Sequence, residues 1–383
     1  MITFLVKRLA QMFLTIFLFF TIIFFFIQAQ PGSIANEALT NPNFTPEVRE
    51  QIIRTFGLDK PVWQQYLIFV KNYFTGNMGV SFSLYPRTVT GIIAERLPRT
   101  IMLFVTAAVI SFYLGFAAGK MIAWRRGSLT EYAATLGGVT LFTVFTPWFA
   151  LMMIWFFAFK AGWFPVGKFL DPILWSGSDV DANHVFTRML VTAAAATGAI
   201  LIAWYLAPKS GLTWSRWIAP GTALASAVVI VAAWGQSGLD VFALDILWHM
   251  ALPVLTLALI SFAATMLLTR NSMLETMRED YVFAARAKGL PEKVVRDRHV
   301  ARNALLPILT SFVFTIAFAV DGGVIIESIF SWPGMGQTLV SAAISEDLPL
   351  AVGALVFTGV FVLVAHLISD LLNMYLDPRL RSW

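Results

Sequence analysis

The chain has 383 residues, of which 58% are hydrophobic and 13% are charged, and its formal net charge is +5. A soluble globular domain has about 45–50% apolar and about 25% charged residues, so this composition is typical of a membrane protein and argues against a soluble enzyme. With no cysteine and 4 histidines, the sequence excludes a disulfide or thiolate metal site and disfavours a histidine metal site. In a membrane chain the positions of Lys and Arg matter more than their sum, so the charge does not indicate a nucleic acid partner.

Eight apolar stretches are predicted to cross the membrane as helices. Each is about 20 residues long or longer, which is enough to span the hydrocarbon core with every backbone group hydrogen-bonded. All but one are free of charge, and the exception carries Asp321. The stretches are Leu9 to Ile27, Thr100 to Gly119, Tyr132 to Phe159, Met189 to Leu206, Trp217 to Gly238, Ile246 to Thr269, Ala304 to about Glu327, and Leu348 to Ser369.

Residues 1–30 are interpreted as a retained N-terminal anchor helix. The 19 uncharged residues from Leu9 to Ile27 are long for the apolar part of a signal peptide, and Gln28 to Pro31 make a poor cleavage site.

The distribution of basic residues predicts the orientation. If the N-terminus is cytoplasmic, eight crossings return the C-terminus to the cytoplasm, and 17 of the 27 Lys and Arg residues then lie in cytoplasmic segments. The short outer loops hold 3 (Lys160, Lys168 and Arg188), and the other 7 lie in the long segment 30–99, where the positive-inside rule has little force. We therefore expect a multi-pass protein of the cell (inner) membrane with both termini in the cytoplasm.

Residues 31–99 form the predicted extracytoplasmic segment. Thr45 and Pro46 are a helix start signal, and Gly57 is a stop signal. A second amphipathic run extends from Pro61 to Phe74. This segment is either a small packed cap or a docking surface for a partner outside the cell, and the sequence leaves both open.

Residues 270–303, here called the basic loop, form the one cytoplasmic segment large enough to meet a partner. The loop carries 8 basic and 5 acidic side chains. It reads as two short helices broken at Gly289 to Pro291, because proline cannot continue a helix interior but suits the first turn of the next helix. Ala284, Ala285, Ala287 and Gly289 leave little side-chain bulk, so another protein can approach the backbone closely.

Two runs in this loop resemble the cytoplasmic loop of binding-protein-dependent ABC importer permeases, and more narrowly the B-type permease of the oligopeptide and dipeptide importers. They are Asp280 to Leu290 and Arg298 to Pro307. Further matches are Phe56 to Pro61, Gln65 to Leu67, Gly76 to Gly79, Glu95 to Thr100, Glu327 to Gly336, and Leu376 to Arg381. The sequence departs from the family pattern in having Phe283 where the general motif begins with Glu, and in having eight predicted spans where the family usually has six.

The resemblance implies an all-α polytopic membrane protein with the type I ABC importer transmembrane fold: six family spans plus an additional two-span hairpin at about residues 185–240. The transmembrane domain is expected over residues 95–374, followed by a cytoplasmic tail at 375–383. A hairpin adds an even number of crossings, so it leaves the basic loop in the cytoplasm.

No phosphate-binding loop occurs in the sequence, so the energy for transport is expected from another chain. The resemblance implies a homologous sister permease, two ATP-binding subunits that bind ATP and Mg²⁺, and an extracytoplasmic substrate-binding protein, with the lipid bilayer around them. The permease itself is expected to hold no catalytic residue, metal or cofactor.

The predicted ATPase-coupling residues lie in the basic loop. Ala284, Ala285 and Gly289 are expected to fit closely against an ATPase, and Arg286 and Lys288 to make polar contacts with it. Asp321 is a candidate for the translocation path, because an ionisable group within a span usually faces a cavity or a partner. Interfacial solvation or the backbone of Gly322 and Gly323 could satisfy Asp321 instead.

Peptides are the leading cargo, with nickel complexes, glutathione and oligosaccharides as alternatives for the same machinery. An ion-coupled secondary transporter would be expected to carry several charged residues within its spans, and only Asp321 fits that pattern. The sequence has no paired Asp within the spans, no Ser/His arrangement and no metal cluster, which argues against an intramembrane enzyme. The basic loop argues against a membrane scaffold, which would not need it.

Overall fold

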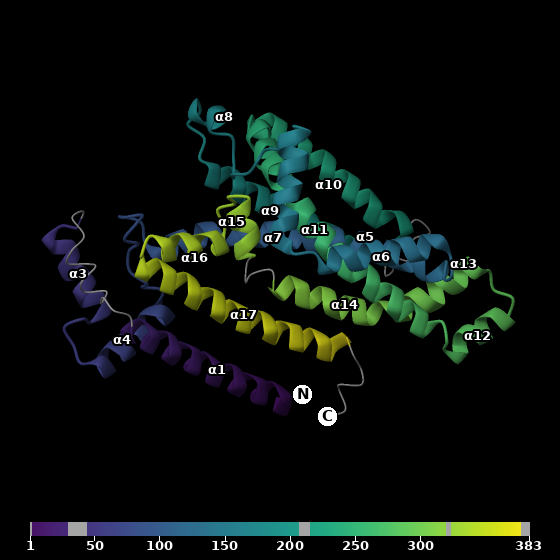
Figure 1. Cartoon of the computed structure of the whole chain (residues 1–383), viewed down its shortest axis with the longest axis horizontal. Helices are drawn as coiled ribbons and strands as arrows, with labels where there is room; N and C mark the ends of the chain where they lie inside the picture. The colour runs from purple at the N-terminus through teal and green to yellow at the C-terminus, as the bar shows by residue number, and fades with distance from the viewer. Residues whose placement is uncertain (1, 30–43, 207–214, 319–322, 377–383) are drawn as a thin grey trace. The chain divides into compact units, whose positions relative to one another are not determined.

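The computed structural model describes residues 2–29, 44–206, 215–318 and 323–376. The protein is mostly helical (82%), and its described part holds one isolated β-bridge, between Val80 and Thr88, and no strand (Figure 1). The helices are α1 (Ile2–Ala29), α3 (Pro46–Phe56), α4 (Val62–Thr75), α5 (Val89–Trp124), α6 (Leu129–Thr143), α7 (Thr146–Met153), the π-helix η1 (Ile154–Lys160), α8 (Pro172–Ser176), α9 (Ala182–Leu206), α10 (Ser215–Ser237), α11 (Asp240–Thr276), α12 (Asp280–Ala287), α13 (Glu292–Val294), the π-helix η3 (Val295–Val300), α14 (Ala301–Phe318), α15 (Val324–Ile329), α16 (Met335–Ile344) and α17 (Leu348–Leu376).

The eight predicted spans fall in α1, α5, α6 with α7 and η1, α9, α10, α11, α14 with α15, and α17. Within the described residues, 5 helices are long and apolar enough to cross a membrane, or up to 6 if α6 and the helix that follows it count as one broken span bent by 105°. A multi-span helical protein is therefore confirmed, while the count of eight, as six plus a hairpin, stays a prediction.

Helix α5 begins well before the predicted span at Thr100. Its first residue is Val89, because Thr88 caps the helix by accepting a hydrogen bond from the Gly91 N–H at 3.2 Å. The predicted outer segment 31–99 and the predicted transmembrane domain thus share one continuous helix of 36 residues. The two shorter helices of the segment agree with their sequence signals: α3 is capped by Thr45 and ends at Gly57, and α4 ends at Gly76.

The chain forms two compact units, Met1–Leu151 with Val254–Trp383, and Met152–Pro253. In the first unit, α1 lies alongside α17 (Figure 1), and side chains of α1, α4, α5, α16 and α17 share one apolar core. A second core joins the end of α5 to the end of α11, α12, η3 and the start of α14. Each core joins α5 to helices that are distant from it in sequence, and this burial of apolar helix faces stabilises the unit.

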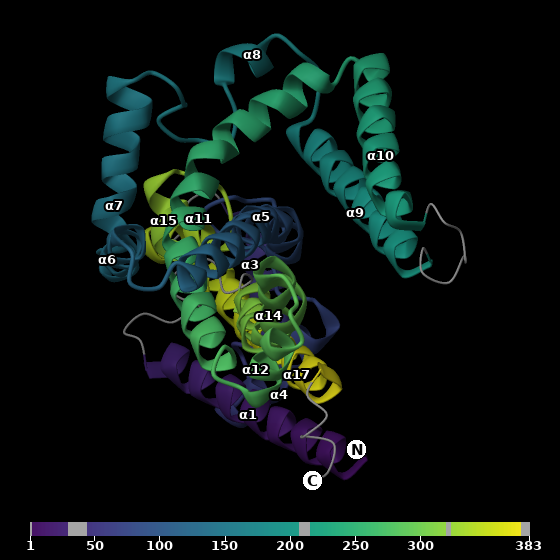
Figure 2. The same cartoon turned by 90° about the vertical axis from the view of Figure 1, so that its right-hand side faces the viewer.

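In the second unit, α9 and α10 pack side by side (Figure 2). Arg188 of α9 donates to the Ala233 carbonyl at 3.2 Å and lies over the Trp234 ring at 4.9 Å. In the same unit, the Asp245 carboxylate accepts hydrogen bonds from the Asp171 N–H at 3.0 Å and the Trp175 indole N–H at 2.8 Å. These contacts tie the turn that holds α8 to the beginning of α11.

Two glycines allow α5 to approach α11 closely in the first unit. A Cβ at Gly115 would lie 2.7 Å from the Thr265 Cβ, and one at Gly119 would lie 2.5 Å from the Thr269 Cβ and 2.6 Å from the Met266 carbonyl oxygen. The four-residue spacing places both glycines on one helix face, as in other close helix contacts within membranes.

We expect Gly119→Ala to destabilise the protein, because the new methyl group meets a backbone oxygen that cannot move aside. Overpacking of this kind costs about 1–3 kcal/mol. Gly137→Ala in α6 is the matched control: its Cβ would have no atom within 4 Å, and alanine favours a helix by about 1 kcal/mol over glycine. Thermal unfolding in mild detergent, followed by tryptophan fluorescence, should give a lower midpoint for Gly119→Ala alone. Equal midpoints for the two variants would contradict the close approach.

Candidate functional site

The basic loop folds as an elbow, as its sequence predicts. α12 ends at Ala287, and Gly289 then takes a left-handed conformation with φ of 71°. Pro291 is the N-cap of α13, which runs on through η3 into α14. Glycine suits this turn because a left-handed conformation costs other residues about 1–2 kcal/mol.

The inner face of the elbow is an apolar core. Val282 and Ala285 of α12 are buried with Val295 and Val300 of η3, and Ala123 at the end of α5 belongs to the same cluster. The structure therefore places Ala285 against the protein's own core, whereas the sequence predicts that it contacts an ATPase. The reason is the helical period: Ala285 follows Val282 by three residues and shares the face of α12 that packs on the core, whereas Ala284 lies on the exposed face.

The outer face of the elbow combines small, aromatic and basic side chains. Ala284, Lys288 and Gly289 are exposed, and a Cβ at Gly289 would have no atom within 4 Å. Phe283, which departs from the family motif, is 57% exposed beside them. This outer face (Phe283, Ala284, Lys288 and Gly289) is a surface that a partner can approach down to the backbone.

Arg286 lies across the elbow. Its Nε donates to the Glu292 carboxylate at 3.1 Å, and its guanidinium lies 5.7 Å from the centre of the Trp124 ring at the end of α5. A second ion pair joins the loop to α5, between Lys120 and Asp297 at 3.1 Å. The elbow is thus attached to α5 by two cations as well as by the apolar core.

The beginning of the loop is attached to α6. The Arg270 Nε donates to the Glu131 carboxylate at 3.0 Å, and the Gly127 N–H donates to the same carboxylate at 2.6 Å. Ser272 also donates to the Ala304 carbonyl at 2.9 Å, which links the beginning of the loop to α14. A displacement of the loop would therefore move α5, α6, α11 and α14 together.

These four helices also enclose a cavity of about 350 Å³ in the first unit. Its described lining is uncharged and includes five hydroxyl groups, from Ser111 of α5, Ser261 and Thr265 of α11, and Ser311 and Thr315 of α14. Three of these hydroxyls bond to carbonyls of their own helix: Ser111 at 2.9 Å, Thr265 at 3.0 Å and Thr315 at 2.9 Å. Asp321, the predicted path residue, lies outside the described residues.

Two buried carboxylates were not predicted as site residues. The Glu327 carboxylate is fully buried and accepts hydrogen bonds from the Thr100 hydroxyl at 2.7 Å and the Gln337 N–H at 3.1 Å. The Asp347 carboxylate, also fully buried, accepts from the Ser83 N–H at 2.9 Å and caps α17 at the Leu350 N–H at 3.1 Å. Each holds a helix N-terminus against a segment distant in sequence, so both are structural anchors rather than part of the cavity.

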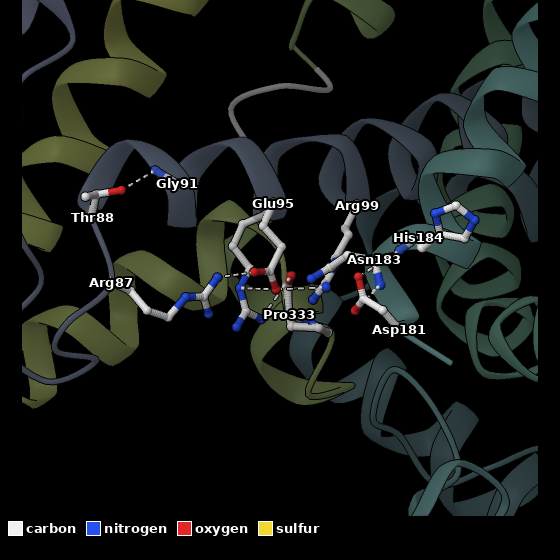
Figure 3. A network of polar contacts seen from close by, with 10 residues as sticks. Arg87, Thr88, Gly91, Glu95, Arg99, Asp181, Asn183, His184 and Pro333 are labelled. Carbon is white, nitrogen blue, oxygen red and sulfur yellow. Dashed lines mark hydrogen bonds and ion pairs between the residues drawn. The ribbon is translucent and has the colours of Figure 1, made fainter. Parts of the chain in front are cut away.

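A cluster of charged side chains surrounds the beginning of α5 (Figure 3). The Glu95 carboxylate pairs with Arg87 and with Arg99, the latter at 2.9 Å, and Arg96 donates to the Pro333 carbonyl at 3.4 Å. Glu95, Arg96, Arg99 and Pro333 belong to two motifs that carry the family resemblance, Glu95 to Thr100 and Glu327 to Gly336. The contact of Arg96 with Pro333 joins residues 237 positions apart, which no local pattern reveals, whereas Glu95 pairs with Arg87 and Arg99 within eight positions. Among the described residues, no three His, Asp or Glu side chains gather as metal ligands.

The sequence matches two family models over most of its length. A model described as the inner membrane component of binding-protein-dependent transport systems matches residues 111–382, and a model of the N-terminal part of such membrane components matches residues 1–104.

Individual relatives cover 94–100% of the chain. The chain is 28% identical over 383 residues to the dipeptide transport system permease protein DppB of Lactococcus lactis subsp. cremoris, covering 100% of both chains. It is 30% identical over 364 residues to a putative peptide permease of Brucella ovis, covering 94% of this chain and 93% of the relative. It is 29% identical over 384 residues to the di/tripeptide transport system permease protein DppB of Pseudomonas aeruginosa, covering 100% of this chain and 99% of the relative. The chain therefore belongs to the family of inner membrane components of binding-protein-dependent transport systems.

Proposed function

We propose that the chain is a permease subunit of an ATP-driven importer of di- or oligopeptides. With a sister permease it forms the translocation path, two partner subunits bind ATP and Mg²⁺ and hydrolyse the nucleotide, and an extracytoplasmic binding protein delivers the cargo. The family supports the role of the subunit, and the names of the relatives, which are dipeptide and di/tripeptide permeases, support the cargo.

The outer face of the elbow is the observation that carries the proposal. Ala284 and Gly289 allow a partner to reach the backbone, Phe283 offers an apolar contact, and Lys288 offers a charge to an acidic group of the ATPase. Arg286 stabilises the shape of the elbow by its hydrogen bond to Glu292, and Ala285 does so because it is buried in the core. We therefore assign the coupling contact to Ala284, Lys288 and Gly289, with Arg286 and Ala285 as positioning residues.

This role requires the basic loop to lie in the cytoplasm. The bias of 17 cytoplasmic to 3 outer-loop basic residues supports that orientation, with both termini on the same side. We assign residues 31–99 to the side of the binding protein. The pair of helices at about 185–240 is a membrane hairpin added to the six family spans.

The hydroxyl-lined cavity is suited to a segment of the path for peptides. Hydroxyl groups both donate and accept hydrogen bonds, so they can replace the water bound to peptide N–H and C=O groups. The absence of charge from the described lining favours release, because an uncharged site does not hold the charged ends of a peptide tightly. Motion of α5, α11 and α14, driven at the basic loop, would then open and close this segment. Asp321 remains proposed as a further path residue.

The test is uptake by the importer reconstituted in proteoliposomes with its co-purified partners. We expect labelled dipeptides and tripeptides to accumulate only with ATP and the binding protein, and unlabelled peptides to compete. Free amino acids should not compete. Selective uptake of glutathione, a nickel complex or an oligosaccharide would support the ATP-driven importer and contradict peptides as its cargo. Uptake driven by an ion gradient without ATP would contradict the proposal as a whole.

A further inference from the structure

Helix α4 packs antiparallel along the second half of α1. The register is given by Gln28 with Gln65 (Nε2 to Oε1, 2.8 Å), Phe24 with Tyr66 (ring centroids 5.3 Å apart) and Phe20 with Phe74 (ring centroids 5.5 Å apart). Residues 20 and 28 of α1 are about 12 Å apart along the helix axis, at about 1.5 Å per residue. Side chains of α4 therefore contact α1 over about 12 Å, from Gln28 to Phe20.

This register places α4 beside apolar helix rather than beyond its end. α1 is a candidate membrane span from Val6 to Ala29, and Gln28 lies at the end of that span. A span of 24 residues is about 36 Å long and exceeds a hydrocarbon core of about 30 Å by only a few ångströms. Helix α4 contacts α1 from Gln28, at the end of the span, to Phe20, so part of α4 lies at the depth of the hydrocarbon core.

One face of α4 is apolar and uncovered by this chain. Trp63, Leu67 and Phe74 are 62%, 56% and 66% exposed, and their spacing of four and seven residues puts them on one helix face, here called the α4 strip. Gln64, Lys71 and Thr75 lie on a neighbouring polar face. Lys71 is nearly one turn closer to the Gln65 end than Phe74 is, and its long side chain can extend toward the membrane surface.

Between α1 and α4 runs a groove of about 620 Å³ whose lining includes Phe17 and Phe25 of α1 and Trp63 and Leu67 of α4. Its two hydroxyl groups, from Thr21 and Tyr66, hydrogen-bond to each other at 2.9 Å. That bond leaves few polar groups for a peptide or protein ligand. The groove continues into the exposed phenylalanine face of α1, which is the face that a span presents to lipid.

Carbonyls at the end of α4 have hydrogen-bond partners within the chain. Carbonyls at a helix C-terminus have no partner within the helix and are costly to bury in hydrocarbon. Here the Asn77 N–H donates to the Asn72 carbonyl at 2.8 Å, the Gly76 N–H to the Tyr73 carbonyl at 3.3 Å, and the Thr75 hydroxyl to the Lys71 carbonyl at 2.9 Å.

We infer that α4 is inserted in the lipid leaflet nearest the end of α1, with its strip facing phospholipid acyl chains and the groove filled by them. Part of the segment 31–99, expected to lie outside the membrane, then belongs to the membrane domain and fixes the depth and tilt of α1. This inference is independent of the cargo and of the ATPase contact.

Site-directed spin labelling tests the inference, and the absence of native cysteine makes single labels straightforward. The strip variants are Trp63→Cys, Leu67→Cys and Phe74→Cys, and the matched controls on the polar face are Gln64→Cys, Lys71→Cys and Thr75→Cys. Each labelled chain is assembled with cysteine-free partner subunits in phospholipid nanodiscs. Collision of the label with oxygen, which concentrates in lipid, is compared with collision with a water-soluble nickel chelate.

We expect the ratio of oxygen to nickel collisions to be severalfold higher on the strip than on the polar face, and to rise from Trp63 through Leu67 to Phe74. Frequent nickel collisions along the strip would show that water covers it. Infrequent collisions with both reagents would show that a protein partner covers it. Either result would overturn the inference, and the labelled chains are compared in nanodiscs that elute as one monodisperse complex with all partner subunits.

Discussion

Gly289→Glu is expected to reduce ATP-dependent uptake to background while the chain stays in the membrane and its ATPase partners continue to hydrolyse ATP. Gly289 lies in the left-handed region at φ of 71°, and its missing side chain leaves open space on the outer face of the elbow. A glutamate there adds backbone strain of about 1–2 kcal/mol. It also places bulk and negative charge beside Lys288, where the partner must approach.

Two controls separate the surface effect from the strain. Gly238→Glu makes the same change at another left-handed glycine, with φ of 66° and no atom within 4 Å of a Cβ, and should leave uptake close to that of the unmodified chain. Gly289→Asn keeps a residue that tolerates the left-handed conformation and adds no charge, so it should retain much of the uptake.

The measurement is the ratio of peptide transported to ATP hydrolysed in proteoliposomes. We expect this ratio to fall at least tenfold for Gly289→Glu. Transport by Gly289→Glu at the unmodified rate would show that the elbow does not make the coupling contact. The basic loop would then be an ordinary solvated segment.

The helices and their ends follow largely from local sequence. Long apolar runs predict α1, α5, α11 and α17 because a span needs only its own residues to satisfy its backbone. The elbow at Gly289 to Pro291 and the ends of α3 and α4 also follow from residues within a few positions, since capping and left-handed glycines act locally. The early start of α5 depends on Thr88, a capping residue outside the apolar run.

The contacts between helices could not be predicted in the same way. Thr100 and Glu327 are 227 positions apart, and Ser81 and Asp347 are 266 positions apart, so no local pattern pairs them. The difference between Ala284 and Ala285 required knowledge of which face of α12 packs on η3. The hydroxyls of the cavity carry no sequence signal either, because serine and threonine also occur in spans where they bond to their own helix.

Glu327→Ala is expected to prevent stable assembly of the first unit. The carboxylate is fully buried and accepts from the Thr100 hydroxyl and from the backbone N–H groups of Gly336 and Gln337 at the start of α16. Alanine leaves these donors without an acceptor in a place that water does not reach. Each orphaned donor costs about 1–3 kcal/mol, and the cavity left by the shorter side chain adds to that cost.

The surrounding motif shows why no neighbour can replace the carboxylate. A Cβ at Gly334 would lie 2.3 Å from the Glu327 Oε1, and one at Gly336 would lie 2.7 Å from the Val324 Cα, so the turn is closed around the side chain. Thr100 also accepts from the Met335 N–H at 2.8 Å. Thr100 and Glu327 thus act together to hold the beginning of α16 against α5.

Thermal unfolding in mild detergent and the yield of monodisperse protein measure the effect. Glu327→Ala should lower both strongly, and Glu327→Gln, which keeps one acceptor oxygen and the volume of the side chain, should lower them less. Glu346→Gln is the matched control, because it removes the same charge from an exposed side chain and should change neither. A Glu327→Ala protein with unchanged yield and midpoint would mean that the start of α16 is held mainly by the buried rings of Phe330 and Trp332. The hydrogen bonds to the carboxylate would then add little beyond what water offers in the unfolded chain.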